Sequence, residues 1–416
     1  MIFWIIIQNF NHFFGLEEFL YYLCPEKFSI NLDKAMFIRE LESRIGQKLF
    51  KGKAIIVMGA RQVGKTTLFN EVLTNQTDKV LRLNLDESEA RQLLTDASLD
   101  TLRLLIADNT IIMIDEAQRV ENIGLTLKRI VDNFPQVQLM VTGSSSLELR
   151  AKINEPLTGR KWEYLLFPIS AQEILDSNGF LSLKQSLESR LIYGSYPDVL
   201  NHEEDARETL LNLANSYLYK DLLELEGIRK PALLEKLLIA LALQLGSEVS
   251  YNELAKTIQS DTKTVEKYVD LLEKCFVIFR LGAFSRNLRN ELKKSRKIYF
   301  YDNGIRNAII QNFSPVGLRN DMGALWENYF ISERIKANHY QGRYVRNYFW
   351  RTTTQQEIDY IEEEDGQFSV FEMKWNPNRS NTKIPSTFLN AYPVKTQVVV
   401  TPENYLEYLV VPKNVE

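Results

Sequence analysis

Cysteine and histidine are scarce in this 416-residue sequence, and their scarcity limits the chemistry open to the protein. The two cysteines, Cys24 and Cys275, lie far apart and have no neighbours that could act as metal ligands. Disulfide frameworks and zinc sites need cysteines at short, regular spacings, so the sequence argues against both and fits a reducing cytoplasm. The three histidines leave little material for histidine-based metal sites or catalytic triads.

Long apolar runs and a strong excess of one charge are also missing. The first seven residues are apolar, whereas a helix that spans a bilayer needs about 20 such residues and a signal peptide needs a basic start. Lysine and arginine number 50 against 54 acidic residues, which gives a net charge of −4. This balance predicts no general affinity for nucleic acid or membranes, so a nucleic-acid site would have to be a local basic patch. We therefore expect a cytoplasmic protein without a membrane partner.

A chain of this length suits two or three domains. Met36 opens a segment typical of a natural start, so residues 1–35 are either an artefact of the start site or a genuine N-terminal arm. From there to about residue 160, short apolar runs alternate with amphipathic segments, which predicts an α/β fold with a parallel sheet covered on both faces. The runs typical of buried strands are residues 54–59, 80–86, 110–115 and 137–143.

The segment Gly59–Thr66 matches the Walker A pattern GxxxxGK[ST], directly after an apolar run and before a helical segment. Its glycines let backbone N–H groups surround a phosphate at a helix N-terminus, where the helix dipole favours anions. Lys65 is expected to reach the β- and γ-phosphates, and the Thr66 hydroxyl to ligate Mg²⁺. The alternative is a glycine-rich turn without nucleotide. The residues expected to bind ATP here are Gly59, Ala60, Arg61, Gln62, Val63, Gly64, Lys65, Thr66 and Thr67.

Two further strand ends predict the rest of an ATPase site. The apolar run 111–114 leads to Asp115 and Glu116, and paired carboxylates after a buried strand are costly unless a cation lies there. We expect Asp115 to hold Mg²⁺ through water, and Glu116 to polarise the attacking water, which favours hydrolysis over mere binding. Ser144 follows the next strand and is expected to contact the γ-phosphate or that water, unless it belongs to a plain loop. Arg150 and Arg160 are both candidates for an arginine finger, of which Arg160 is preferred, and the alternative is a surface arginine.

Residues 247–306 have the element order of a winged helix-turn-helix. Ser250 with Glu253 predicts a capped helix, followed by a polar turn, a second helix and two strands. We expect a phosphate-binding wing that contacts DNA, because basic residues outnumber acids seven to one between positions 280 and 297. The alternative is a protein-binding or lid element. The basic residues are Arg280, Arg286, Arg289, Lys293, Lys294, Arg296 and Lys297, and the acid is Glu291.

Strands return in the C-terminal part, and they carry a pattern of acids and lysine. Asp359 lies in one predicted strand, and Glu372 and Lys374 project from the same face of the next. If the strands pair, Asp359 and Glu372 form a Mg²⁺ site, with Lys374 where a water or a phosphate oxygen arrives. Glu327, on a preceding helix, could supply a further ligand. This is the PD-(D/E)xK nuclease pattern, although exposed charge pairs produce similar sequences by chance.

Together these motifs resemble a large prokaryotic family of AAA-type ATPases joined to a C-terminal domain with a PD-(D/E)xK-like core. The resemblance covers about residues 36–412, and it includes the segments LTGR, KIYFYDNGIRNAI and WENYF. It implies nucleotide-binding, helical, winged-helix and nuclease-like parts in this order, but neither an established substrate nor DNA cleavage. The acidic and lysine positions are all present here, and the tail before Met36 is the main departure.

We therefore expect an ATP-hydrolysing AAA-type enzyme, associated with DNA, whose hydrolysis is coupled to a Mg²⁺-dependent nuclease-like domain. The alternative is a nucleotide-controlled switch that binds DNA or a partner protein without cleavage. The sequence leaves the oligomeric state open. The expected parts are an N-terminal extension (1–35), a P-loop ATPase core (36–160), a helical lid or connector (161–246), a winged helix (247–306) and a restriction-endonuclease-like α+β domain (307–416).

Overall fold

The computed structural model describes most of the chain after residue 36, and residues 37–416 form one unit. The expectations for residues 1–35 and for the basic segment 286–295 lie outside the described residues. In the described residues, no helix has the length and apolar character needed to cross a membrane. The described ranges are 37–74, 78–144, 146–215, 230–285, 296–352, 354–379 and 383–411.

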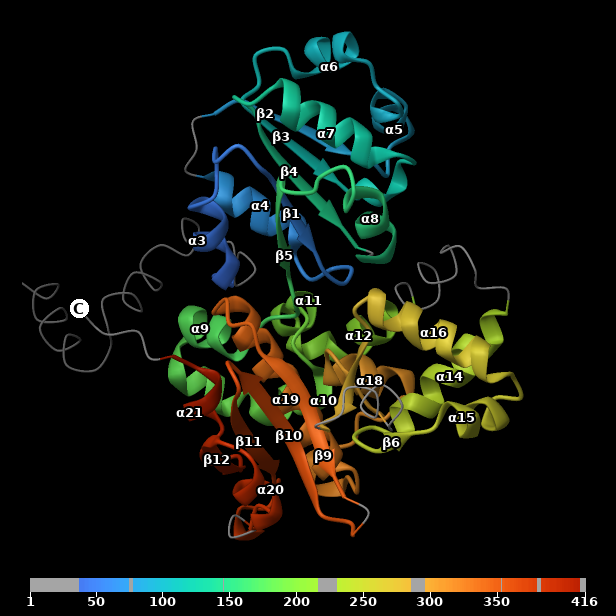
Figure 1. The fold of residues 1–416 in the computed structure, drawn as a ribbon, viewed down its shortest axis with the longest axis vertical. Coiled ribbons are helices and arrows are strands. Elements are labelled where there is room, and N and C mark those ends of the chain that lie inside the picture. Colours follow the sequence, from blue (N-terminus) through green and yellow to red (C-terminus); the bar gives the residue numbers. More distant parts are fainter. Residues whose placement is uncertain are drawn as a thin grey trace, which may run out of the picture. The chain divides into compact units, whose positions relative to one another are not determined.

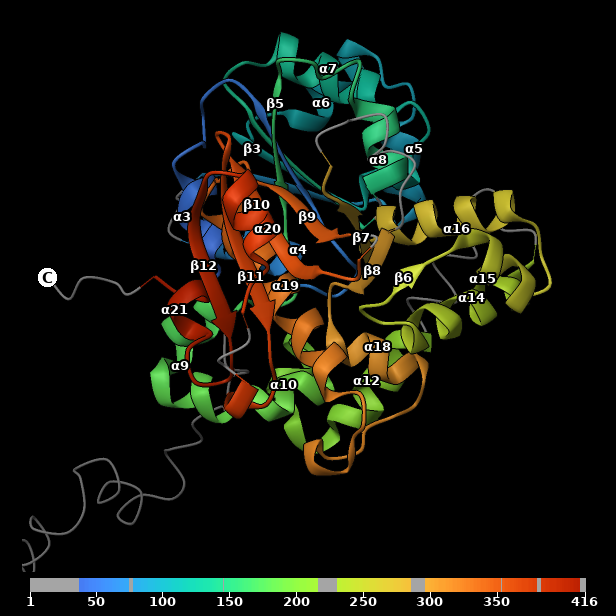
Figure 2. The ribbon, with the colours of Figure 1, turned by 60° about the horizontal axis from the view of Figure 1, so that its bottom comes forward.

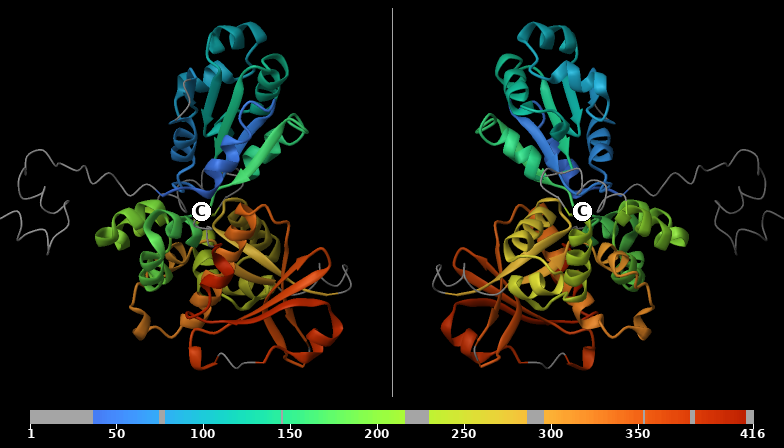
Figure 3. Two further views of the ribbon diagram at one scale, coloured as in Figure 1. Left: turned by 90° about the vertical axis from the view of Figure 1, so that its left-hand side faces the viewer. Right: turned by 90° about the vertical axis from the view of Figure 1, so that its right-hand side faces the viewer.

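The N-terminal half contains a five-stranded parallel sheet in the order β2-β3-β4-β1-β5. Its central strands are buried along their whole length because they are the apolar runs of the sequence, and Figure 3 shows helices on both sides of them. The predicted α/β fold with a parallel sheet is confirmed. The strands are β1 Ala54–Met58, β2 Val80–Asn84, β3 Ile111–Asp115, β4 Gln138–Gly143 and β5 Lys161–Leu165, and the helices are α3 Glu40–Gly46, α4 Lys65–Thr74, α5 Ser88–Leu94, α6 Leu99–Ile106, α7 Ile123–Asn133 and α8 Ser146–Ile153.

Strand β5 extends this sheet beyond residue 160, where a domain boundary was expected. It pairs in parallel with β1 at the edge of the sheet. Tyr164 is its only buried residue, so it lacks the apolar run that marks a central strand, and the sequence pattern did not reveal it. The helices that follow are α9 Ala171–Gln185, α10 Leu187–Tyr193, α11 Pro197–Asn201, α12 Ala206–Ala214 and α14 Pro231–Leu243.

The next segment has two short helices with clear start signals. Ser250 accepts a hydrogen bond from the Glu253 backbone N–H at the start of α15, and Asp261 does the same for Thr264 at the start of α16. Strand β8 then pairs antiparallel with both β6 and β7. The elements are β6 Glu248–Val249, α15 Tyr251–Thr257, α16 Thr262–Lys274, β7 Ile278–Ala283 and β8 Arg296–Phe300.

A seven-stranded mixed sheet joins this segment to the C-terminal part, across the boundary expected after residue 306. Its order is β12-β11-β10-β9-β7-β8-β6, which Figure 2 shows from one edge to the other. Helix α19 is buried around most of its circumference, as expected for a helix inside a domain. The remaining elements, labelled in part in Figure 1, are α18 Asn303–Ile309, α19 Met322–Tyr340, β9 Arg346–Arg351, β10 Glu357–Glu364, β11 Gln367–Met373, α20 Ser386–Ala391, β12 Val394–Val400 and α21 Leu406–Leu409.

Candidate nucleotide and carboxylate sites

The Walker A segment forms a tight loop between β1 and α4. A Cβ on Gly59 would lie 2.1 Å from the Leu166 backbone oxygen, so this position has no room for a side chain. Gln62 and Gly64 have φ values of 60° and 92°, which turn the backbone as a phosphate-binding loop requires. Lys65 is 5% exposed, and its Nζ donates to the carbonyl oxygens of Gly59, at 3.1 Å, and Ala60, at 2.9 Å. Lys65 therefore packs against the backbone of the loop that is expected to bind the phosphates.

The end of β3 meets the start of α4 at the position expected for Mg²⁺. The Thr66 hydroxyl donates to Asp115 Oδ2 at 2.7 Å. The other carboxylate oxygen, Oδ1, accepts from the Thr142 hydroxyl and from the Glu116 N–H, the latter at 3.1 Å. Thr142 is fully buried on β4 and was not predicted as a site residue. Threonine hydroxyl and aspartate oxygens are hard ligands that suit Mg²⁺, and Mg²⁺ keeps most of its waters, so these residues fit the metal.

Glu116 is held beside Asp115 by two side chains. Its Oε2 accepts from the Ser144 hydroxyl at 2.8 Å and from the Gln118 amide, and Gln118 Nε2 also donates to Ser144 Oγ at 2.9 Å. Glu116 has φ 54°, so the backbone turns sharply as it leaves the strand. The structure thus brings together Glu116 and the predicted Ser144, and it adds Gln118, whose proximity to the motif was the only signal in the sequence.

The two candidate finger arginines bind acidic side chains in this structure. Arg160 is 40% exposed, and its Nε lies 2.5 Å from Asp132 Oδ1 on α7. Arg150 Nε lies 3.7 Å from Glu163 Oε2 on β5. An arginine-finger role for Arg160 stays a prediction.

The C-terminal acids and lysine come together on β10 and β11. These strands are antiparallel, and the pairing of Tyr360 with Phe371 makes Asp359 and Glu372 the next residues along the ladder. Lys374 Nζ lies 2.6 Å from Glu372 Oε1 and 3.8 Å from Asp359 Oδ2. The strand pairing on which the prediction depended is therefore present.

Glu327 on α19 lies against a lysine from β8. Its Oε1 accepts from Lys297 Nζ at 3.2 Å and from the Tyr299 hydroxyl at 2.5 Å. Lys297 is only 3% exposed and also lies 2.7 Å from Glu357 Oε1, at the start of β10. It was predicted to be a phosphate-binding residue of the wing, and this prediction is wrong in the described structure because the buried ammonium faces carboxylates. We call Glu327, Glu357, Asp359, Glu372, Lys297 and Lys374 the carboxylate cluster.

Two other basic residues of the expected wing are described as well. Arg280 forms ion pairs with Asp270, at 2.6 Å, and with Glu273, both on α16. Arg296 lies over the Tyr251 ring, 5.1 Å from its centroid. The ion pairs of Arg280 offset part of the positive charge expected for this segment. The remaining basic residues, Arg286, Arg289, Lys293 and Lys294, lie outside the described residues.

The electrostatics of the carboxylate cluster favour a bound cation. Burial raises the pKa of Glu327 to about 7, and the negative charge of Asp359 acts in the same direction. Burial and Asp359 also raise the pKa of Glu372. Burial opposes the charge of Lys297, but its acidic neighbours outweigh this and raise its pKa. When ionised, the four carboxylates outnumber the two ammonium groups, so a divalent cation would favour their ionised forms.

One buried oxygen of the cluster has the chemistry of a metal ligand. Glu372 Oε2 is buried and has no hydrogen-bond partner among the described residues, and such atoms are rare in folded proteins. In the described residues, no group of three or more His, Cys, Asp or Glu side chains is arranged to hold a metal. Mg²⁺ needs only one or two carboxylates and keeps several waters, so Asp359 and Glu372 fit it as a pair.

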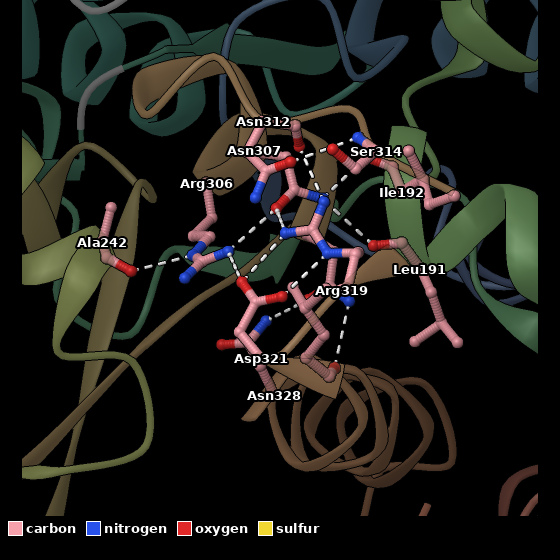
Figure 4. Close-up of polar contacts among 12 residues, drawn as sticks. Leu191, Ile192, Ala242, Arg306, Asn307, Asn312, Ser314, Arg319, Asp321 and Asn328 are labelled. Atoms are coloured by element: carbon pink, nitrogen blue, oxygen red, sulfur yellow. Dashed lines mark hydrogen bonds and ion pairs between the residues drawn. The ribbon is translucent and has the colours of Figure 1, made fainter. Parts of the chain in front are cut away.

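A buried polar cluster anchors the start of α19 and so positions Glu327 (Figure 4). Asp321 accepts from Arg306 at 2.6 Å and from Arg319 at 2.8 Å. Asn307, on α18, donates to the carbonyl oxygens of Leu191 and Ile192 on α10. The KIYFYDNGIRNAI segment therefore ties α10, α18 and α19 together, a structural role that its sequence alone did not reveal.

Comparison with known proteins adds three domain matches. Residues 51–175 match a family model described as an AAA domain. Residues 184–316 and 322–412 match two models that are each described as a domain of unknown function. The first match includes β5, in agreement with the sheet. Each model covers less than half of the chain.

Relatives in other organisms are similar over much of the chain. A Haemophilus influenzae protein is 26% identical over 282 residues, which are 61% of this chain and 68% of that protein. A Mycobacterium tuberculosis protein is 27% identical over 345 residues, 81% of this chain and 73% of that one. Both carry the name "Uncharacterized protein".

Solved structures of ATPases are more distant. The Walker-type ATPase of Pyrococcus abyssi is 17% identical, with a TM-score of 0.47 over 66% of this chain and 96% of that one. The RuvB branch migration motor of Thermotoga maritima is 13% identical, with a TM-score of 0.29 over 63% and 92%. Residues 51–175 thus match an AAA domain, and within them the contacts of Lys65, Thr66 and Asp115 have the geometry of a P-loop nucleotide site.

Proposed function

We propose that the protein hydrolyses ATP with Mg²⁺ at the site formed by the P-loop and the end of β3. The observation that carries this proposal is the 2.7 Å hydrogen bond from Thr66 to Asp115, with Glu116 next to it. Lys65 holds the β- and γ-phosphates, and Thr66 and Asp115 hold Mg²⁺, which when bound neutralises phosphate charge. Glu116 orients the attacking water and accepts its proton, and Ser144 holds the Glu116 carboxylate in place.

An ATPase assay on purified protein tests this proposal. Glu116→Gln removes the general base but keeps the side-chain shape, so we expect hydrolysis to fall about 100-fold or more while ATP binding persists. Lys65→Ala should weaken binding itself. Glu121→Gln changes an exposed glutamate further along the chain and serves as the control. Unchanged hydrolysis in Glu116→Gln would refute the role given to this residue.

We further propose that ATP hydrolysis controls the carboxylate cluster, which acts on DNA with Mg²⁺ as a nuclease-like site. The unpartnered Glu372 Oε2 and the Lys374 ammonium beside it support this. Asp359 and Glu372 would hold Mg²⁺, and Lys374 would meet a water or a phosphate oxygen. The pairing of β8 with β6 and β7 after two capped helices supports a winged helix. DNA contact through that element rests on the basic segment outside the described residues.

A second candidate is a nucleotide-controlled switch that binds DNA or a partner protein without cutting it. The observation in its favour is that Lys297 and Lys374 already neutralise part of the acidic charge. DNA binding and cleavage with ATP and Mg²⁺, measured for the wild type and for Glu372→Gln, separate the two. Glu364→Gln, an acid on the same sheet bound to Arg343, is the matched control. Cleavage lost only in Glu372→Gln supports the nuclease, binding without cleavage supports the switch, and neither binding nor cleavage refutes the association with DNA.

A further inference from the structure

A buried arginine holds the P-loop from behind. Arg39 lies just before α3 and is 7% exposed. Its Nη1 donates to the Val63 carbonyl oxygen at 2.7 Å, inside the Walker A segment. Its Nη2 donates to the Phe167 carbonyl oxygen at 2.7 Å, and its Nε to Glu173 Oε1 at 2.8 Å. One guanidinium therefore joins the phosphate-binding loop to the segment 166–173 that follows β5.

That segment is also in direct contact with the start of the P-loop. The Leu166 N–H donates to the Met58 carbonyl oxygen at 2.7 Å, and the Leu166 carbonyl oxygen fills the space where Gly59 lacks a side chain. Glu173 is fully buried and receives the Arg39 Nε and the backbone N–H of Ser170. The segment is therefore held rigidly against the loop, with little room to move independently.

The same part of the chain is also bound by helix α19. The Phe167 N–H donates to the Tyr340 hydroxyl at 3.0 Å, and the Leu165 N–H to His339 Nε2 at 3.1 Å. Near the start of α9, the Ala171 N–H donates to Glu333 Oε2 at 2.7 Å. Phe167 thus accepts from Arg39 through its carbonyl oxygen and donates to Tyr340 through its N–H.

Helix α19 leads from these contacts to the carboxylate cluster. Tyr340 is its last residue, and Glu327 lies 13 positions earlier in the same helix, which is about 20 Å at ~1.5 Å per residue. The helix is buried over most of its length, so a shift at its end would be carried to Glu327 rather than absorbed by solvent-exposed turns. The path from the Val63 carbonyl to Glu327 contains Arg39, Phe167 and Tyr340.

We propose that Arg39 and Tyr340 are positioning residues that couple the nucleotide state of the P-loop to helix α19 and thus to the carboxylate cluster. This inference rests on the proposed ATP site and deepens it by naming the connection. Nucleotide binding constrains the backbone at Val63, because the neighbouring N–H groups must point at phosphate. Arg39 transmits this constraint to Phe167, and Tyr340 transmits it to α19. Because such coupling is reciprocal, a ligand at the carboxylate cluster also alters nucleotide affinity.

Hydrogen–deuterium exchange of the full-length chain, with and without Mg²⁺ and the slowly hydrolysed analogue ATPγS, tests the coupling. In the wild type we expect amide exchange in residues 322–340 to slow at least twofold when the analogue binds. Tyr340→Phe removes only the hydroxyl that receives the Phe167 N–H, so it should keep nucleotide affinity within about twofold but lose the response of α19. Tyr329→Phe is the control, since this tyrosine lies on the same helix and its buried hydroxyl has no hydrogen-bond partner among the described residues.

Arg39→Lys adds a second test. Lysine keeps the charge opposite Glu173 but cannot reproduce the fork that binds Val63 and Phe167 together, so the α19 response should be lost and nucleotide affinity should fall. If this variant does not fold, Tyr340→Phe decides. The coupling is overturned if the wild type binds the analogue without any change in α19, or if Tyr340→Phe keeps the full response. Either result leaves the proposal of an ATP site standing. A wild type that binds no nucleotide refutes the proposed function itself, and the coupling with it.

Discussion

Glu40 should make the stability of the protein depend on pH in an unusual direction. Burial raises the pKa of this half-buried glutamate to about 7, and the negative charges of Glu173, Asp176 and Glu333 act in the same direction. The Ser170 hydroxyl, which donates to Glu40 Oε1 at 2.7 Å, opposes the shift only in part. The folded protein therefore holds a proton at Glu40 up to a higher pH than the unfolded chain does.

The sign and size of the effect follow from this difference. A folded pKa of about 7 against an ordinary value of 4.5 means that stability is fully present below about pH 4.5 and falls as the pH rises through 7. At ~1.4 kcal/mol for each unit of pKa, the loss is at most about 3.5 kcal/mol, and partial exposure to solvent reduces it to about 1–3 kcal/mol. Glu40→Gln keeps the acceptor for Ser170 and has nothing to titrate, so it should lose this dependence.

Urea unfolding of the wild type and Glu40→Gln at pH 5 and pH 8, followed by circular dichroism, measures the effect. The two proteins should have similar midpoints at pH 5, and the variant should be more stable at pH 8. Glu42→Gln, on the same helix, controls for a change of charge on α3. Other titratable groups, including Glu327, contribute equally to the pH dependence of stability in both proteins, so their contributions cancel when the two are compared. Parallel pH profiles for the wild type and Glu40→Gln would show that the reasoning about burial is wrong.

Three further outcomes can be checked. Gly59→Ala should abolish nucleotide binding in a fluorescent-ATP titration, because the new Cβ would lie 2.1 Å from the Leu166 oxygen and the loop must shift. Thr142→Val should lower the ATP hydrolysis rate about tenfold or more with little effect on folding, because Asp115 loses the hydroxyl that orients it. Lys297→Met should destabilise the fold by up to about 3–5 kcal/mol in thermal unfolding, because it leaves the partly buried Glu327 and Glu357 without their cation. Mg²⁺ should restore part of the loss, and no effect would show that the ion pairs contribute little.

The sequence predicted best the site residues that lie in short motifs next to predicted strands. The Walker A segment follows one apolar strand and the pair Asp115 and Glu116 lies at the end of another, and parallel strands bring their carboxyl ends to one edge of the sheet. The contact of Thr66 with Asp115 was therefore foreseeable. The same holds for Asp359 and Glu372, because alternation along two neighbouring strands places them on a common face once the strands pair.

Residues that complete these sites but lie outside the recognised motifs could not be predicted from the sequence. Thr142 looks like an ordinary residue of a buried strand, and Arg39 looks like a charged residue before a helix. Lys297 was counted with a basic loop because charge along a sequence does not show which side chains turn inward. Only the pairing of β8 with β7, and the packing of α19 beside them, turns its ammonium toward Glu327 and Glu357.

The contacts of Lys297 show that the C-terminal domain includes part of the segment 247–306. Strand β8 belongs to the segment expected to be a separate winged helix, yet it supplies the cation that neutralises Glu327 and Glu357. Strand β7 of that segment also pairs in parallel with β9, so the two parts share one sheet. A fragment that starts at residue 307 would expose the edge of β9 and leave the partly buried Glu327 and Glu357 without their lysine, both of which are costly. Any activity of the carboxylate cluster should therefore be sought in the whole chain, where the middle segment completes the cluster and α19 connects it to the ATPase domain.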